Sequence, residues 1–400
     1  MKSTYFYLFA LLTVLTFASC EDDDDVMTNN LDIPATYEFA REGQSTVAFQ
    51  GQSDRIAMAE ELIQGFTNFE STEEQLNNLF RNPEGIDPFA DPALNESSKS
   101  VRSKVAASQD LFSANAVAQA AIRADFDSWI TAQVTEVFPA RDQLAAAGQA
   151  GQIADGSSTR YVNAWGLEYN QAFAKSLIGA LMYDQLTNNY LSPDVLDAGT
   201  NRDDNDMGTV ADGKPYTTME HKWDEAYGYL FGASADPSKG LDDLGEADNF
   251  LNEYLDRVDE DPDFTGIAAR IESNLRSGRA AIVAGDYEQR DDFAAAIKSD
   301  LETVLAVRAI YYLKNGQLAL RGGDFGGAFH DLSEAYGFVY SLRFVADTDG
   351  GNADLADRVL TALRNADGNG FWDLEDATLE TLAAEVGAAF GVDVAEAANN

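Results

Sequence analysis

A short motif that occurs twice in the chain constrains the fold more than any other feature. The first copy runs from His221 to Tyr229 and the second from His330 to Phe338, with the histidine, Glu-Ala-Tyr-Gly and a final aromatic residue in register. These are the two histidines of the 400-residue chain. Each copy follows a stretch with helical spacing and a polar loop, so we expect an internal duplication of a helical unit.

Apolar residues recur at helical spacing through most of the chain, which predicts amphipathic helices that face a core. One stripe, at a spacing of four, consists of Trp165, Tyr169, Phe173, Leu177 and Leu181. Another, between Ser113 and Pro139, consists of Val117, Ala120, Ala121, Ala124 and Ile130. Helix starts are predicted at a Thr-x-x-Glu capping box near Thr218 and at Asp324 as an N-cap. The stretch Gly148–Gly156 is expected to be a glycine-rich connection.

The fold class that these patterns predict is mainly α, a duplicated antiparallel helical bundle with a short N-terminal β-hairpin. The hairpin is expected because apolar and polar residues alternate in Tyr37–Phe39 and Thr46–Phe49, on either side of Gly43. The expected organisation is a signal peptide (1–19), an acidic tether (20–35), a section with hairpin, helices and loop (36–103), a first helical repeat (104–236), a second helical repeat (241–346), and a C-terminal loop and helix (347–400).

The N-terminus predicts export and lipid attachment. An apolar run from Tyr5 to Phe17 is too short to span a bilayer and has the length of a signal-peptide core. Small residues before Cys20 resemble the lipobox of bacterial lipoproteins, so Cys20 is the expected lipid anchor; the alternative is an ordinary signal peptide with an unrelated cysteine. The block Glu21–Asp25 resembles the acidic tag of lipoproteins on the outer face of the outer membrane, or it is a solvated spacer.

Composition excludes several classes of protein. The formal net charge of −41 makes nucleic-acid binding improbable, because phosphate recognition needs clusters of basic residues. Such a charge either attracts cations and cationic partners or keeps the protein soluble in salty surroundings. The single cysteine, Cys20, excludes intrachain disulfides and thiolate metal sites in the mature chain.

The repeated motif also carries the candidate metal site. A histidine and a glutamate four residues apart lie on one face of a helix, where both could bind the same metal ion. Nitrogen and oxygen ligands of this kind suit iron, zinc or manganese, and the histidines could alternatively hold haem. The predicted ligands are His221, Glu225, His330 and Glu334, with Asp224 beside the first pair, provided that the two copies converge. The alternative is structural: each glutamate holds its histidine, while Gly228 and Gly337 let another helix approach.

Other motifs give weaker signals. The segment 365–376 can be aligned with an EF-hand loop, but Asn365, Trp372 and Asp376 depart from the pattern, so a turn is expected and calcium is not. The chain has no nucleophile elbow, phosphate-binding glycine loop or His-Glu-x-x-His sequence. No catalytic residue is therefore assigned, and the sequence favours a binding protein over an enzyme.

Several segments spread over most of the mature chain resemble a family of Bacteroidetes lipoproteins described as domain of unknown function 4856. They are Tyr37–Phe39 with Ser45–Val47, Asp87–Asn95, Gly166–Glu168 with Asn170–Lys175, Glu220–Tyr229, and Gly368–Asp373. The resemblance implies no established activity. It implies a link to iron or haem acquisition, because such proteins are often encoded near imelysin-like proteins and outer-membrane receptors. Imelysin-like proteins are also helical and duplicated, but their Gly-x-His-x-x-Glu motif differs from the His-x-x-x-Glu spacing here.

Three functions follow as hypotheses. The first is a lipid-anchored surface protein that binds iron, zinc or haem through the His/Glu pairs, with an outer-membrane receptor or an imelysin-like protein as partner. The second is a helical surface receptor for a glycan or peptide, with aromatic residues as ligand contacts. The aromatic candidates are Trp223, Tyr227, Tyr336 and Trp372. The third is a metal-dependent hydrolase at the same His/Glu site.

Overall fold

The computed structural model describes Met1 and residues 31–346, 351–365 and 367–399. The predicted signal peptide apart from Met1, the expected lipid anchor Cys20 and the acidic block Glu21–Asp25 lie outside the described residues. Contacts divide the chain after Asn30, and the fold described below belongs to the part that begins at Leu31.

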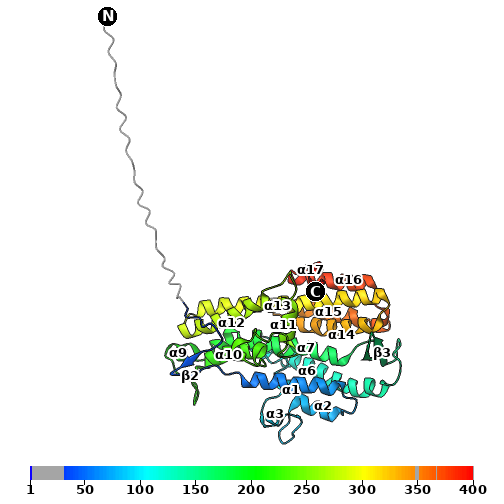
Figure 1. The fold of residues 1–400 in the computed structure, drawn as a ribbon, viewed down its shortest axis with the longest axis horizontal. Helices are drawn as coiled ribbons and strands as arrows, with labels where there is room; N and C mark the ends of the chain where they lie inside the picture. Colours follow the sequence, from blue (N-terminus) through cyan, green and yellow to red (C-terminus); the bar gives the residue numbers. More distant parts are fainter. Residues whose placement is uncertain (2–30, 347–350, 366, 400) are drawn as a thin grey trace. The chain divides into compact units, whose positions relative to one another are not determined.

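Helices make up most of the described chain, so the mainly α prediction is confirmed (Figure 1). The first ten α-helices are α1 (Gln50–Thr67), α2 (Glu73–Arg81), α3 (Pro92–Glu96), α4 (Val101–Lys104), α5 (Gln109–Phe112), α6 (Ala116–Ala132), α7 (Tyr169–Leu177), α8 (Pro193–Leu196), α9 (Asn201–Asp206) and α10 (Thr218–Phe231). The others are α11 (Leu251–Asp259), α12 (Ile267–Ala284), α13 (Tyr287–Gly322), α14 (Phe325–Ser341), α15 (Gly351–Arg364), α16 (Asp376–Phe390) and α17 (Val394–Ala397).

Shorter helical segments extend or connect these helices. The π-helical segments are η1 (Gln133–Val137), η3 (Ile178–Tyr183) and η4 (Leu186–Tyr190), and the 3₁₀ segments are η2 (Phe138–Ala140), η5 (Pro237–Lys239), η6 (Leu342–Phe344) and η7 (Gly370–Asp373). Because η1 and η2 follow α6 directly, that helical stretch continues past Pro139, where the sequence predicted an end. Within the described residues, none of the helices combines the length and the apolar character that a membrane crossing requires.

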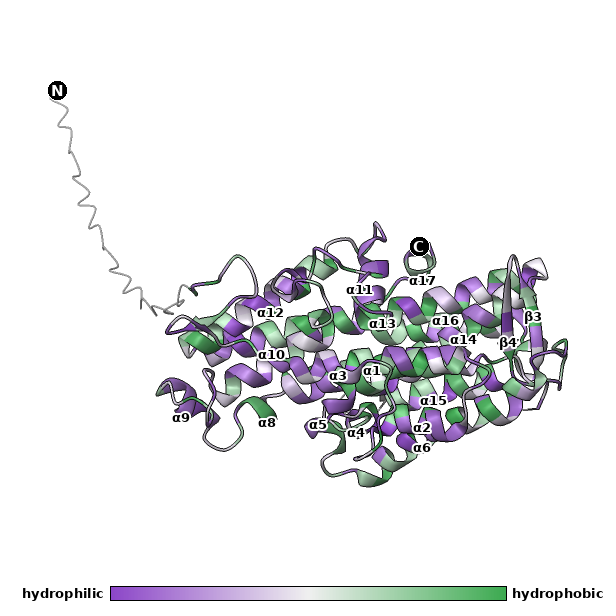
Figure 2. Cartoon of the chain, turned by 60° about the horizontal axis from the view of Figure 1, so that its bottom comes forward, coloured by the Kyte–Doolittle hydropathy of each residue, from purple (hydrophilic) through white to green (hydrophobic). Residues whose placement is uncertain are grey.

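Helix α13 lies at the centre of the helical packing. It contacts α12, α14 and α16, and its core-facing side chains include Ile297, Leu301 and Leu305, which are fully buried. Asp286 caps its first turn by accepting from the amide of Gln289, and Gly323 ends it with a left-handed φ of 75°. By contrast, the short helix α9 is almost entirely hydrophilic (Figure 2).

Two β-hairpins accompany the helices. The predicted N-terminal hairpin is present, but its strands β1 (Ala40–Arg41) and β2 (Gln44–Ser45) lie closer to Gly43 than the predicted segments. A second hairpin, β3 (Gly151–Asp155) with β4 (Ser158–Val162), occupies a stretch where the sequence predicted only a glycine-rich connection. Asp155 pairs with Ser158, so two residues form the turn, and Gly156 takes the positive φ that such a turn requires. The hairpins lie at opposite ends of the helical body (Figure 1).

The predicted helix starts are confirmed, and so is the core stripe through Tyr169, Phe173, Leu177 and Leu181, which are all buried. Thr217 and Glu220 form the expected capping box, and Asp324 caps α14. The predicted core stripe on α6 is correct at Ile130 but wrong before it, because Val117 is 82% exposed and the other buried residues of this helix are Ile122, Phe126 and Trp129.

Similar contacts surround the two copies of the repeated motif. The residue three positions after each histidine accepts a hydrogen bond from a backbone amide just ahead of another helix. Ala48 N donates to Asp224 Oδ2 before α1, and Glu168 N donates to Ser333 Oγ before α7. In each case a hairpin precedes that helix. The two contacting helices and the two motif helices follow one another along the chain in the order α1, α7, α10, α14, so each motif and its partner do not form a continuous segment. The predicted repeat boundaries at 104–236 and 241–346 stay a prediction.

Candidate functional site

The first histidine motif lies on α10, where its polar groups are already paired. His221 Nδ1 lies 2.9 Å from the carbonyl oxygen of Ala48, and its ring stacks on Tyr216. Glu225 accepts from Lys222 Nζ at 2.7 Å and from Gln52 Nε2 at 3.1 Å, whereas His221 Nε2 is 3.9 Å from its carboxylate. The closest cation to Glu225 is therefore a lysine.

The second motif, on α14, shows the same arrangement with different partners. His330 Nδ1 lies 3.0 Å from Glu168 Oε1, and His330 Nε2 is 3.7 Å from Glu334. Lys175 Nζ lies 3.6 Å from Glu334 and 4.5 Å from the centre of the Tyr254 ring. His330 and Glu334 line a cavity of about 360 Å³ with Lys175 and Tyr254.

The two motifs share no described partner, and their donors fit a metal ion poorly. Each glutamate faces a lysine ammonium, which would repel a cation at the same place. Among the described residues, no group of three or more His, Cys, Asp or Glu side chains could hold a metal ion. Asp224, expected beside the first pair, instead accepts from Tyr37 and Arg279 in the core.

Gly228 and Gly337 do what the structural alternative expects of them. A Cβ on Gly228 would meet the Cβ of Phe49 at 2.4 Å, and one on Gly337 would meet the Cβ of Lys175 at 2.4 Å. Each glycine thus admits a neighbouring chain segment against its helix, at α1 for the first motif and at α7 for the second.

Because the chain has two histidines, their titrations can be followed separately by NMR. Burial lowers the pKa of His221 below 6.5 despite the charge of Glu225. Burial also acts on His330, but the hydrogen bond and charge of Glu168, together with Glu334, outweigh it and raise the pKa above 6.5. We expect two imidazole signals that titrate on opposite sides of pH 6.5.

The signs of the linked stability changes are also opposite. The contribution of His330 is fully present below its unfolded-state pKa and is lost as the pH rises through the folded-state pKa; that of His221 is lost as the pH falls. Glu168→Gln is expected to lower the pKa of His330 and leave His221 unchanged. Two signals that titrate together would contradict this assignment.

A separate cleft lies along one face of α6. Its volume is about 750 Å³. Helix α6 and η1 contribute residues spaced three or four apart, which places them on one side of the helix. They are Asp125, Ser128, Trp129, Ala132 and Glu136, with Thr131 and Thr135 beside them. This wall therefore combines an aromatic ring with hydroxyl and carboxylate groups.

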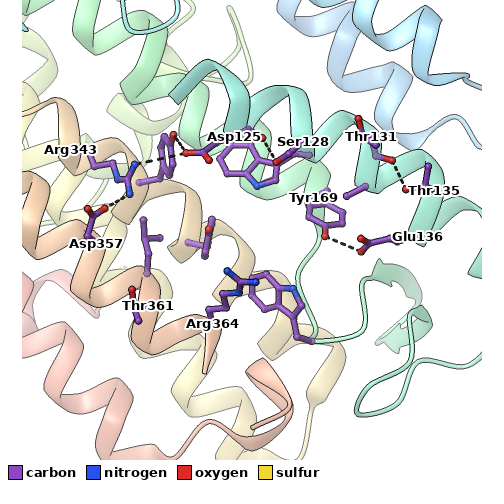
Figure 3. Close-up of a pocket in the computed structure, with 16 residues that line it drawn as sticks. Asp125, Ser128, Thr131, Thr135, Glu136, Tyr169, Arg343, Asp357, Thr361 and Arg364 are labelled. Carbon is purple, nitrogen blue, oxygen red and sulfur yellow. Dashed lines mark hydrogen bonds and ion pairs between the residues drawn. The ribbon is translucent and has the colours of Figure 1, made fainter. Parts of the chain in front are cut away.

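Helix α15 forms the facing wall, and α7 and α14 close the cleft. Figure 3 shows Asp357, Thr361 and Arg364 of α15 on one side and Ser128 and Thr131 on the other. Tyr169 lies at one end, where its hydroxyl donates to Glu136 at 3.1 Å (Figure 3).

Within the described part of the chain, the charged groups of the cleft are paired with one exception. Tyr340 donates to Asp125 at 2.8 Å, and Arg343 is ion-paired with Asp357. Burial raises the pKa of Asp125, although Tyr340 and the charge of Arg343 oppose the rise. No hydrogen bond or ion pair to Arg364 occurs among the described residues, so its guanidinium is available to a ligand.

Five aromatic side chains line the cleft, but they differ in access to it. Trp129, Tyr169 and Tyr340 are less than a tenth exposed, whereas Trp165 and Tyr336 are only partly buried. The centroids of the Trp165 and Tyr336 rings are 6.0 Å apart. These two rings are thus the aromatic surfaces that a ligand in the cleft can reach.

Of the four aromatic residues predicted as ligand contacts, one lies at the cleft. Tyr336 lines it. Trp223 and Tyr227 are fully buried: the indole nitrogen of Trp223 donates to Leu275 O at 2.7 Å, and Tyr227 stacks on Tyr37 at 3.6 Å. Both residues therefore serve the core. Trp372 is half-buried against Phe329.

Fold and site together define a mainly helical protein with a mixed aromatic and polar cleft. The family model for the domain of unknown function DUF4856 matches residues 34–393, and the chain belongs to this family. Neither the curated proteins nor the solved structures contain a match to the chain.

Proposed function

We propose that this protein is a binding protein that takes a polyhydroxylated, glycan-type ligand in the cleft between α6 and α15. The observation that carries the proposal is the joint presence of accessible aromatic rings and hydrogen-bonding groups in a cleft of about 750 Å³. Pockets for small molecules typically measure roughly 300–1,000 Å³.

The chemistry of the cleft suits sugars for two reasons. The rings of Trp165 and Tyr336 offer apolar faces on which the C–H surface of a sugar ring can pack. The carboxylates of Asp125 and Glu136 keep acceptor capacity for hydroxyl groups, and Arg364 offers several donors. Donors and acceptors alternate with apolar surface, which matches a neutral polyhydroxylated ligand better than a purely apolar one.

Arg364→Gln is expected to weaken binding of such a ligand roughly tenfold, which corresponds to about 1.4 kcal/mol. The substitution removes the charged guanidinium donors of Arg364, which form no hydrogen bond with any described residue. Affinity electrophoresis against soluble glucan, xylan and mannan identifies a binding polysaccharide, and calorimetry with its oligosaccharide measures the change.

Arg358→Gln is the matched control, because Arg358 lies on the same helix, is 62% exposed and does not line the cleft. It should bind as the wild type does. Failure of every polysaccharide to retard the wild type, or equal affinities for the Arg364 variant and the wild type, would rule out this assignment.

The proposed setting is the cell surface. A lipid on Cys20 and the acidic block Glu21–Asp25 would display the protein on the outer face of the outer membrane of a Bacteroidetes cell. A ligand captured there would pass to an outer-membrane receptor, or an imelysin-like protein would share the task, as the family resemblance implies. Labelling with radioactive palmitate, wild type against Cys20→Ala, tests the anchor.

Binding of iron, zinc or haem at the histidines is a second proposal with less support. It rests on the cavity that His330 and Glu334 line, and it must overcome the lysine beside each glutamate. Metal analysis of the purified mature protein after loading, wild type against His221→Ala with His330→Ala, tests it. Hydrolysis at the same groups would in addition require a bound metal and ranks last.

A further inference from the structure

Four cations gather at the start of α1, in a chain that has 27 basic against 68 acidic residues. This cation cluster consists of Arg55, Lys99, Lys104 and Lys222. Lys104 and Lys222 share one aromatic ring: their ammonium groups lie 5.5 Å and 5.4 Å from the centre of Tyr190.

The other two members approach the same first turn. A Cβ built on Gly51 would lie 2.7 Å from Cε of Lys99, so the absence of a side chain there makes room for this lysine. Arg55 is only 6% exposed and donates to the carbonyl oxygens of Gly51 and Ser100.

Carboxylates are scarce around the cluster. Glu225 holds Lys222 at 2.7 Å, and Asp54 accepts from Gln50 and Ser97. Among the described residues, no acidic side chain forms an ion pair with Arg55, Lys99 or Lys104. An arrangement of mutually repelling cations costs free energy, and a bound anion would remove that cost.

Two further observations point the same way. Burial, together with the charges of Arg55, Lys222 and Lys99, lowers the pKa of Lys104 to about 8, although Glu225 opposes the shift. The 18-residue helix α1 starts without a side-chain cap and without an acidic residue in its first turn, which leaves its N-terminal amides favourable to an anion.

We propose that the cation cluster binds a tetrahedral oxyanion, sulfate or phosphate, either free or as an ester on a larger ligand. Cationic groups that approach from α1, α4, α10 and the segment before α4 match an acceptor with oxygens in several directions. The site is separate from the cleft between α6 and α15, so it stands whether or not that cleft binds glycans.

Calorimetry with sodium sulfate and with sodium phosphate, each against sodium chloride at equal ionic strength, tests the proposal. We expect saturable binding of at least one oxyanion to the wild type and a roughly tenfold or larger rise in Kd for Lys104→Gln. Lys239→Gln is the matched control, because Lys239 is exposed and paired with Asp236. Melting curves establish that both variants are folded.

NMR of ¹³C-dimethylated lysines gives a second reading that a loss of structure cannot imitate. Without oxyanion, Lys104 is expected to titrate near pH 8, and sulfate or phosphate should move that titration upward. A sulfated polysaccharide against its desulfated form separates an ester from a free ion as the source. No saturable binding of either ion, or an unchanged Kd in Lys104→Gln, would overturn the proposal.

Discussion

Arg279→Met is expected to lower the free energy of unfolding by about 3–5 kcal/mol, because it removes the charged partner of the buried Asp224 and one of the two arginines paired with Glu220. Arg279 on α12 is fully buried. Its Nε lies 3.0 Å from Asp224, its Nη1 lies 3.2 Å from Glu220, and its Nη2 donates to Thr46. Urea denaturation with linear extrapolation measures the loss.

The loss should depend on pH. Burial raises the pKa of Asp224 to about 6 even with Arg279 present, and removal of this arginine raises it further. A carboxyl group whose pKa is raised by folding contributes stability that is present below its unfolded-state pKa and is lost as the pH rises through the folded-state pKa. The variant should therefore lose more stability at pH 8 than at pH 5.

Arg270→Met is the matched control on the same helix. Arg270 is 55% exposed and is paired with Asp300 at 2.9 Å, and exposed pairs of this kind contribute about 0–1 kcal/mol. Equal losses in the two variants, or no dependence on pH for Arg279→Met, would show that the buried pairs do not stabilise the fold as described.

The sequence predicted what depends on neighbouring residues. The capping box at Thr217 and the N-cap at Asp324 are local features, because each side chain bonds to an amide within three residues. The second hairpin was missed, since its strands do not alternate clearly and Gly156 was assigned to a glycine-rich connection. The first part of the α6 face, before Ile130, was assigned wrongly because alanines at helical spacing occur on exposed faces as well as buried ones.

The candidate sites were harder to predict for a physical reason. The wall of the cleft on α6 follows a helical period from Asp125 to Glu136, so a search for polar and aromatic residues at that spacing could have found it. The opposite wall on α15 could not be paired with it, because that contact forms only in the folded chain. Likewise, Lys175 is far from Glu334 in the sequence, so the contact between these two side chains was not predicted.

Trp223→Ala is expected to lower the free energy of unfolding by about 3–5 kcal/mol, because it removes a large buried side chain and leaves a cavity. The Trp223 side chain is fully buried and lies where a Cβ on Gly278 would come within 2.1 Å of its ring. Its indole nitrogen donates to Leu275 O, so Trp223→Phe loses that bond, and its stability should lie between those of Trp223→Ala and the wild type.

Trp372→Ala, at a half-buried position, should lower the stability less than Trp223→Ala. Urea denaturation gives the free energy of unfolding of each of the three variants. Calorimetry on the folded protein measures whether each variant still binds the polysaccharide. Replacement of a residue that contacts the ligand would weaken polysaccharide binding and change the stability little. Replacement of a core residue would lower the stability and leave the affinity of the folded protein unchanged.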